Sequence, residues 1–166
     1  MAVDILKRWA LFVVLCMVQV LFLNHIWLFD VATPLLYMLF VITFRRNTPK
    51  WAILLWSFCL GLTIDTFTNT PGLASGCLTL TGMMQPYLAE VFLPKDAPED
   101  IEISMRTLGI SKFATLSLIL TGTYCLIFFA LEAFSFYNLL YWVECSVFST
   151  ALTMALLLAV ESVRSK

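Results

Sequence analysis

Residues 113–131 read FATLSLILTGTYCLIFFAL, a run of 19 residues without a charged side chain. A helix needs about 20 predominantly apolar residues to cross the hydrocarbon core of a bilayer. Two further charge-free runs have similar lengths, Trp9–Phe29 with 21 residues and Thr66–Ala89 with 24. The whole chain of 166 residues is 61% hydrophobic and 13% charged, whereas soluble domains are roughly half apolar and about a quarter charged. The sequence therefore predicts an all-α polytopic membrane protein with a single transmembrane domain over residues 1–166.

The Lys and Arg residues lie in clusters that alternate with the apolar runs. All ten occur near the two termini and in the segments 45–50 and 95–112. By the positive-inside rule these clusters face the cytoplasm, so we expect both termini to be cytoplasmic and the chain to form three hairpins. The six expected transmembrane helices span residues 7–24, 29–44, 51–67, 72–93, 112–132 and 139–160.

The second expected span, 29–44, is the shortest of the six. It contains only 14 uncharged residues from Val31 to Phe44, about 21 Å of helix at 1.5 Å per residue. Pro34 would lie in the first turns of this helix, where a missing amide costs little. A chain with five spans would break the pattern of the basic residues, so we retain this span in the prediction.

A cytoplasmic connector is expected at residues 95–111. It is rich in charge and contains signals for a short helix that begins near Pro98 and ends at Gly109. Ile101, Met105 and Leu108 would then lie on one face. Such a helix either lies on the inner leaflet as an amphipathic connector or docks a cytoplasmic partner, and periodicity alone does not separate these possibilities.

Net charge and cysteine spacing exclude several other classes of protein. The formal net charge of −1 gives no electrostatic support for binding nucleic acid. The five cysteines occur singly, without a C-x-x-C pair, which favours small core residues over a disulfide framework or a zinc site. They are Cys16, Cys59, Cys77, Cys125 and Cys145. No metal or cofactor is expected.

Polar side chains inside the predicted spans are the candidates for function, because a carboxylate at the bilayer centre costs roughly 2.5 to 3.5 kcal/mol. Asp65 lies near the end of the third span, Glu132 closes the fifth, and Glu144 lies inside the sixth. Asp65 and Glu132 could be hydrated at the outer interface. Glu144 could be hydrated if the helix tilts or if water enters the bundle. A proton or cation relay through Glu144 and Asp65 is the alternative.

The fourth span begins after a turn, Thr68-Asn69-Thr70-Pro71-Gly72, in which Asn69 or Thr70 could cap the following helix. This span is rich in small and hydroxyl side chains, which let helices approach closely, so it is expected to be a central packed helix. Gln85 beside Pro86 indicates a kink or a polar contact within the bundle. The candidate contacts to the bundle or to a partner are Asp65, Asn69, Pro71, Gly72, Gln85 and Glu144.

Enzymatic activity is not expected. The single histidine, His25, excludes a two-histidine zinc site, and the run 73–76 departs from the Gly-x-Ser-Gly of rhomboid proteases. Asp30 and Asp65 lack the sequence context of an intramembrane aspartyl protease. No catalytic residue is assigned.

Several loop sequences resemble the MreD family, rod shape-determining membrane proteins of bacteria, in the form seen in Bacteroidetes. The resemblance covers nearly the whole chain and rests on residues 23–26, 32–37, 46–49, 61–72, 85–87 and 94–100. The glycine, aspartate and turn of the family correspond to Gly61, Asp65, Pro71 and Gly72. MreD proteins are also similar to the six-helix substrate-binding subunits of energy-coupling-factor vitamin transporters.

The resemblance implies a non-enzymatic subunit of the cell-elongation machinery in the bacterial inner membrane. Its implied partners are the bitopic protein MreC, the actin-like MreB, the glycosyltransferase RodA and a class B penicillin-binding protein. We expect a scaffold that docks MreC and so regulates peptidoglycan synthesis. The alternative is a small-molecule membrane transporter or its substrate-binding subunit, although the bulky residues 9–18 do not resemble the small-residue stripe through which vitamin-transporter subunits bind their coupling protein.

Overall fold

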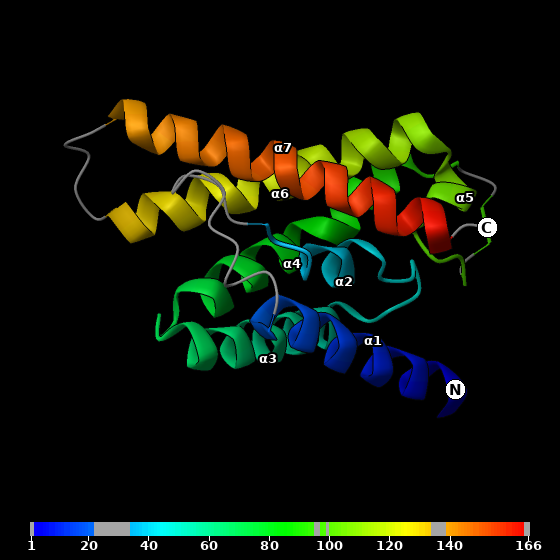
Figure 1. Cartoon of the computed structure of the whole chain (residues 1–166). Coiled ribbons are helices and arrows are strands. Elements are labelled where there is room, and N and C mark those ends of the chain that lie inside the picture. Colours follow the sequence, from blue (N-terminus) through cyan, green and yellow to red (C-terminus); the bar gives the residue numbers. More distant parts are fainter. Residues whose placement is uncertain (1, 22–33, 95–96, 99, 134–138, 165–166) are drawn as a thin grey trace.

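The computed structural model describes residues 2–21, 34–94, 97–98, 100–133 and 139–164. Within these ranges the regular structure is helical, apart from an isolated β-bridge between Arg45 and Glu102. This confirms the prediction of an all-α chain. The helices, shown in Figure 1, are α1 (Ala2–Leu21), α2 (Met38–Ile42), α3 (Lys50–Thr68), α4 (Leu73–Phe92), α5 (Met105–Leu108), α6 (Ile110–Ala133) and α7 (Leu139–Arg164).

Two antiparallel hairpins, α3 with α4 and α6 with α7, form the body of the molecule (Figure 1). Helix α4 joins the hairpins, because it packs against α3 on one side and α6 on the other. Helix α1 packs against α3, and the short helix α2 lies between α1, α4 and α6. The start of α1 and the end of α7 lie at the same end of the molecule (Figure 1).

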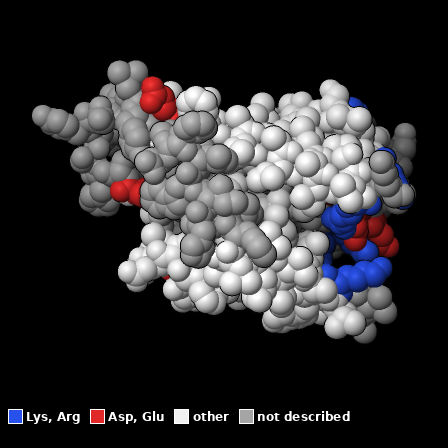
Figure 2. Space-filling model, in the orientation of Figure 1, with Lys and Arg blue, Asp and Glu red and all other residues white. Residues whose placement is uncertain are grey.

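The surface has the polarity of a membrane protein. Within the described residues, three helical segments are long and apolar enough to cross a bilayer, Lys50–Thr68, Ile110–Glu132 and Val143–Arg164. Figure 2 shows a broad belt without charged side chains, with basic side chains gathered at one end of the molecule. Large apolar side chains such as Val13, Met83 and Phe148 are more than half exposed. In water such surfaces would be unfavourable, whereas lipid tails cover them without cost.

The α3–α4 hairpin is held at unusually short range by small residues. A Cβ atom at Gly61 would lie 2.3 Å from the Cα of Ser75, and one at Gly82 would lie 2.6 Å from the Oγ of Ser57. At Gly61 only glycine allows the two backbones to come this close, whereas Gly82 makes room for the side chain of Ser57. The prediction that the small residues of the fourth span let it pack tightly is therefore confirmed for α4.

The predicted continuous helix over residues 29–44 is wrong in the part that the structure describes. Only Met38–Ile42 form a helix, and all of residues 34–44 are buried. This segment runs antiparallel to α1: Pro34 contacts Gln19, and Phe44 lies under Arg8. From Arg8 to Gln19 the helix axis rises about 16 Å, so the segment lies alongside about three turns of α1 without being a continuous helix.

The predicted helix in the connector is also shorter than expected. It begins after Ser104, not at Pro98, because Ser104 and Thr107 form a capping box. It ends at Gly109, as predicted, where φ is +81°. The residues before it are extended, pair with Arg45 through the bridge at Glu102, and bury Ile103 completely. The connector therefore packs on the bundle through both parts: Ile103 and Ile101 from the extended segment, and Met105 and Leu108 from α5.

Candidate functional site

Asp65 provides the N-terminal cap of α4 from the neighbouring helix. Its two carboxylate oxygens accept hydrogen bonds from the backbone amides of Ala74, at 2.8 Å, and Ser75, at 2.9 Å. These are the second and third residues of α4, whose amides have no partner within the helix. The N-cap residue itself, Gly72, has no side chain to accept them. Asp65 is 4% exposed, and its negative charge also lies at the positive end of the helix dipole.

The turn between α3 and α4 has the tight geometry that its sequence predicts, but with different capping. Asn69 ends α3 in the left-handed conformation, with φ +58°, and Gly72 has φ +87°. Thr70 donates a hydrogen bond to Asp65, so neither Asn69 nor Thr70 caps α4. Pro71 is exposed in the turn. The structure thus brings Asp65, Thr70 and the turn together as one structural unit.

Gln85 and Glu144 have contrasting positions. Gln85 is 1% exposed, and its side-chain amide donates to the carbonyl of Ile42 at 3.4 Å, which confirms a polar contact within the bundle. Glu144 is exposed on α7, and both oxygens of Asp65 are bonded to α4. Neither position supports the proton relay through Glu144 and Asp65 that the sequence suggested. Glu132 is likewise exposed, at the end of α6.

Two polar side chains that the sequence analysis did not single out hold the buried segment 34–44. Gln19 of α1 donates to the carbonyl of Pro34 at 2.9 Å and accepts from the amide of Leu36 at 3.1 Å. Thr153 of α7 accepts from the amide of Leu35 at 3.1 Å. Buried backbone groups outside a helix need such partners, especially where no water reaches them. Gln19 interrupts an apolar run of the sequence and could have been found on that ground, whereas nothing distinguishes Thr153 from the other hydroxyl residues of α7.

A pair of tyrosines links this segment to α6. The hydroxyl groups of Tyr37 and Tyr124 lie 2.6 Å apart, and their rings pack edge to face at 5.8 Å. Both side chains are almost completely buried. The pair satisfies two hydroxyl groups that would otherwise lie unbonded among apolar side chains.

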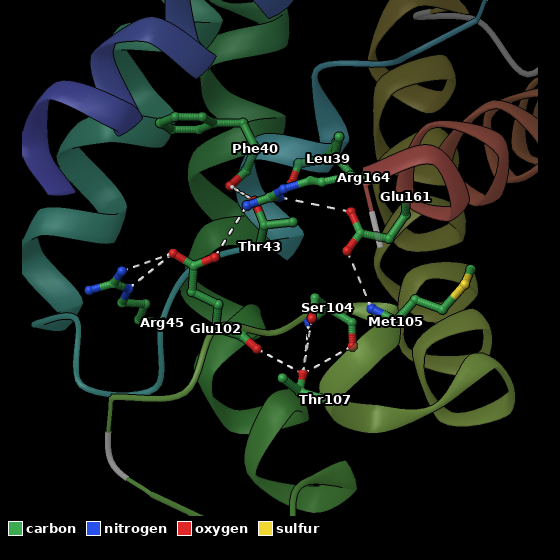
Figure 3. A network of polar contacts seen from close by, with 10 residues as sticks. All are labelled: Leu39, Phe40, Thr43, Arg45, Glu102, Ser104, Met105, Thr107, Glu161 and Arg164. Atoms are coloured by element: carbon green, nitrogen blue, oxygen red, sulfur yellow. Dashed lines mark hydrogen bonds and ion pairs between the residues drawn. The ribbon is translucent and has the colours of Figure 1, made fainter. Parts of the chain in front are cut away.

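Charged residues from the segment after α2, from the connector and from the end of α7 form a cluster (Figure 3). Glu102 of the connector lies between two arginines, 3.0 Å from Arg45 and 3.2 Å from Arg164. Glu161 of α7 is 1% exposed, accepts from the amide of Met105 at 3.3 Å, and lies 3.8 Å from Arg164. The cluster thus joins the connector and the start of α5 to the last turns of α7.

A pocket of about 150 Å³ opens beside this cluster. Four separate parts of the chain line it: α1, the residues after α2, the connector and α7. The lining residues are Lys7, Arg8, Leu11, Thr43, Arg45, Glu102 and Arg164. Of the lining residues that the structure describes, four are basic and one is acidic. Among the residues that the structure describes, no group of His, Cys, Asp and Glu side chains is placed to hold a metal ion.

The prediction of the cysteines as small core residues is confirmed for four of the five and is wrong for Cys59. All five are free, and Cys16, Cys77, Cys125 and Cys145 are buried, whereas Cys59 is exposed.

Comparison of the chain with protein-family models, with curated proteins and with solved structures finds no match. What the chain does is therefore inferred from its residues and their geometry.

Proposed function

We propose that the chain is a non-enzymatic scaffold of the bacterial cell-elongation machinery, related to MreD, in the inner membrane. Helices α1, α3, α4, α6 and α7 would cross the bilayer, and residues 34–44 would return through the interior of the bundle, giving six passages. Both termini would be cytoplasmic. The scaffold would dock MreC and, through it, act with MreB, RodA and a class B penicillin-binding protein.

The observation that carries the scaffold proposal is the buried segment at the centre of the bundle. Met38, Phe40, Val41, Ile42 and Phe44 have no exposed surface. Their side chains fill the space between α1, α4 and α6, where a carrier would need room for a substrate. A centre filled by the chain's own residues supports a rigid body whose partners bind at its outer surface.

The use of the polar side chains supports the same reading. Gln19, Gln85 and Asp65 bond to backbone groups of the chain itself. Intramembrane polar groups that serve transport line a water-filled path or pair with one another. Here they fix an irregular segment and a helix start, which is a structural task.

The distribution of basic side chains supports the orientation. Those that the structure describes lie at the end formed by the start of α1, the connector and the end of α7 (Figures 1 and 2). Short loops on the cytoplasmic side of a membrane are enriched in Lys and Arg. The opposite end carries the α3–α4 turn, in which no Lys or Arg occurs.

Purification from native membranes tests the proposal. A tagged copy of the full chain, extracted in mild detergent, is expected to retain MreC and the elongation synthase, identified by mass spectrometry. A matched control is an unrelated tagged protein with several membrane spans from the same cells. Recovery of a pair of transport ATPases, or of a stoichiometric small molecule without MreC, would contradict the scaffold and favour the transporter subunit.

A further inference from the structure

Lys50 of α3 and Tyr87 of α4 form an exposed pair at the end of the α3–α4 hairpin opposite its turn. The Lys50 ammonium donates a hydrogen bond to the Tyr87 hydroxyl at 3.2 Å and lies 4.2 Å from the centre of the tyrosine ring. Trp51, the next residue of α3, is 69% exposed, and Tyr87 is 55% exposed. Two large aromatic rings beside a cation are thus turned outward, where they do little to pack the hairpin.

The exposed surface of both helices changes character at this pair. Before Lys50 the exposed side chains of Arg46 and Asn47 are polar, and Glu90 is exposed about one turn after Tyr87. In the direction of the turn the large exposed side chains are apolar: Leu55, Phe58 and Leu62 on α3, and Leu80, Met83 and Met84 on α4. The pair therefore lies at the boundary between a polar and an apolar surface.

The length of α3 agrees with a membrane boundary at Lys50. Asn69 ends the helix in the α3–α4 turn and is exposed there. Between Lys50 and Asn69 the helix rises about 28 Å, close to the thickness of about 30 Å of the hydrocarbon core of a bilayer. A bilayer that has one boundary at Lys50 thus has its other boundary at the turn.

The three side chains have the chemistry of the region between headgroups and acyl chains. Trp and Tyr are enriched at this depth, because their rings are apolar and their N–H and O–H groups are polar. A lysine there keeps its stem among apolar groups and its ammonium near the phosphates. The ammonium of Lys50 has three N–H donors, and the hydrogen bond to Tyr87 uses one of them.

We propose that Lys50, Trp51 and Tyr87 form an interfacial anchor that binds the phospholipid headgroup region and fixes the depth of the α3–α4 hairpin. The leaflet is the cytoplasmic one in the orientation proposed above. The Lys50 ammonium contacts lipid phosphate, and the rings of Trp51 and Tyr87 lie at the upper end of the acyl chains. An anchored hairpin keeps this end at the headgroups when the bilayer becomes thicker, whereas a hairpin without an anchor adjusts its position to the mismatch.

The test uses the purified full chain in three bilayers of phosphatidylcholine and phosphatidylglycerol that differ only in acyl chain length. A spin label at residue 55, introduced by Leu55→Cys in a chain with Cys59→Ser, reports its depth through its accessibility to oxygen and to a water-soluble nickel chelate. Leu55 is exposed and lies about 8 Å further along α3 than Lys50. We expect the label at this depth below the headgroups in all three bilayers.

The anchor variant combines Lys50→Gln, Trp51→Leu and Tyr87→Leu. Its label is expected to lie deeper as the bilayer becomes thicker, by half of the added thickness if the hairpin returns to the bilayer centre. The matched control combines Lys112→Gln, Phe67→Leu and Phe148→Leu, which removes one exposed cation and two exposed rings elsewhere. The control is expected to keep a constant depth.

A conservative variant separates loss of the anchor from loss of the fold. Lys50→Arg with Tyr87→Trp keeps a cation beside an aromatic ring and is expected to hold the label at constant depth. A depth that increases with thickness in the original chain or in this variant would overturn the proposal, and so would equal behaviour of the anchor variant and its control. A label at the bilayer centre would also contradict it. These results do not depend on whether MreC binds, so each proposal can fail separately.

Discussion

Asp65 of α3 accepts a hydrogen bond from the backbone amide of Ser75 in α4 at 2.9 Å. One helical turn before Asp65, Gly61 lets the backbone of Ser75 approach so closely that a Cβ would lie 2.3 Å from its Cα. Asp65 and Gly61 thus lie on one face of α3, and both contact Ser75 of α4. This contact determines how the two helices pack and where α4 begins.

Removal of the Asp65 carboxylate should loosen the start of α4. In Asp65→Ala, two amides of the first turn lose their acceptor, and we expect the free energy of unfolding to fall by about 0.5 to 2 kcal/mol. Asp65→Asn keeps one acceptor oxygen and should lie between. Thermal unfolding of the purified protein measures this, with the exposed neighbour substitution Thr66→Ala as control. An Asp65→Ala protein as stable as the control would show that the cap contributes nothing.

Gly61→Ala should be far more disruptive than an alanine at another helical glycine. The new methyl group would overlap the α4 backbone, and overpacking of this kind costs about 1 to 3 kcal/mol. At Gly76 a Cβ would meet nothing within 4 Å, so Gly76→Ala should be neutral or stabilise the helix by about 0.5 to 1 kcal/mol. The two variants have the same chemistry, and equal melting temperatures would contradict the close packing.

The helices show how far the sequence alone determines this fold. Helix α3 (Lys50–Thr68) and α4 (Leu73–Phe92) lie within one residue of the predicted limits at both ends, because apolar length and the turn at Asn69 and Gly72 define them locally. The segment 34–44 differs, because its backbone bonds to Gln19 and Thr153, which are distant in sequence. Periodicity carries no information about such partners. The same holds for the charged pocket, whose cations come from three separate parts of the chain.

Substitution of Gln19 should expose the backbone of the buried segment. Gln19→Leu leaves the Pro34 carbonyl and the Leu36 amide without their partner, and each unsatisfied group costs about 1 to 3 kcal/mol. Hydrogen exchange measured by mass spectrometry should become faster in the peptide that contains Leu36. Unchanged exchange in that peptide would contradict the contact.

Thr153→Val tests the other side of the same segment with little change in volume. It removes the acceptor for the Leu35 amide, so exchange at Leu35 should become faster and stability should fall by about 1 to 3 kcal/mol. Thr123→Val, at a partly exposed threonine that bonds only to its own helix among the described contacts, is the matched control. If both variants behave alike, Thr153 has no special part in holding the segment.

The effects of Tyr37 and Tyr124 on the free energy of unfolding should be strongly coupled. Tyr37→Phe or Tyr124→Phe alone leaves one buried hydroxyl without its partner, at a cost of about 1 to 3 kcal/mol, whereas the double variant removes both groups and should cost less than the sum. Chemical or thermal unfolding of the four proteins gives the coupling energy. Strictly additive effects would show that the 2.6 Å contact contributes no stability.

Photo-crosslinking in living cells tests the central claim, that the outer surface of a rigid bundle binds MreC, most directly. A photoreactive residue would replace one exposed side chain on each long helix in turn: Val13, Phe58, Met83, Leu118 and Phe148. The scaffold predicts a covalent adduct with MreC that is strong at one helix, or at two adjacent helices, and weak at the others. Absence of an MreC adduct at all five positions, in cells where each variant inserts and supports rod shape, would contradict it.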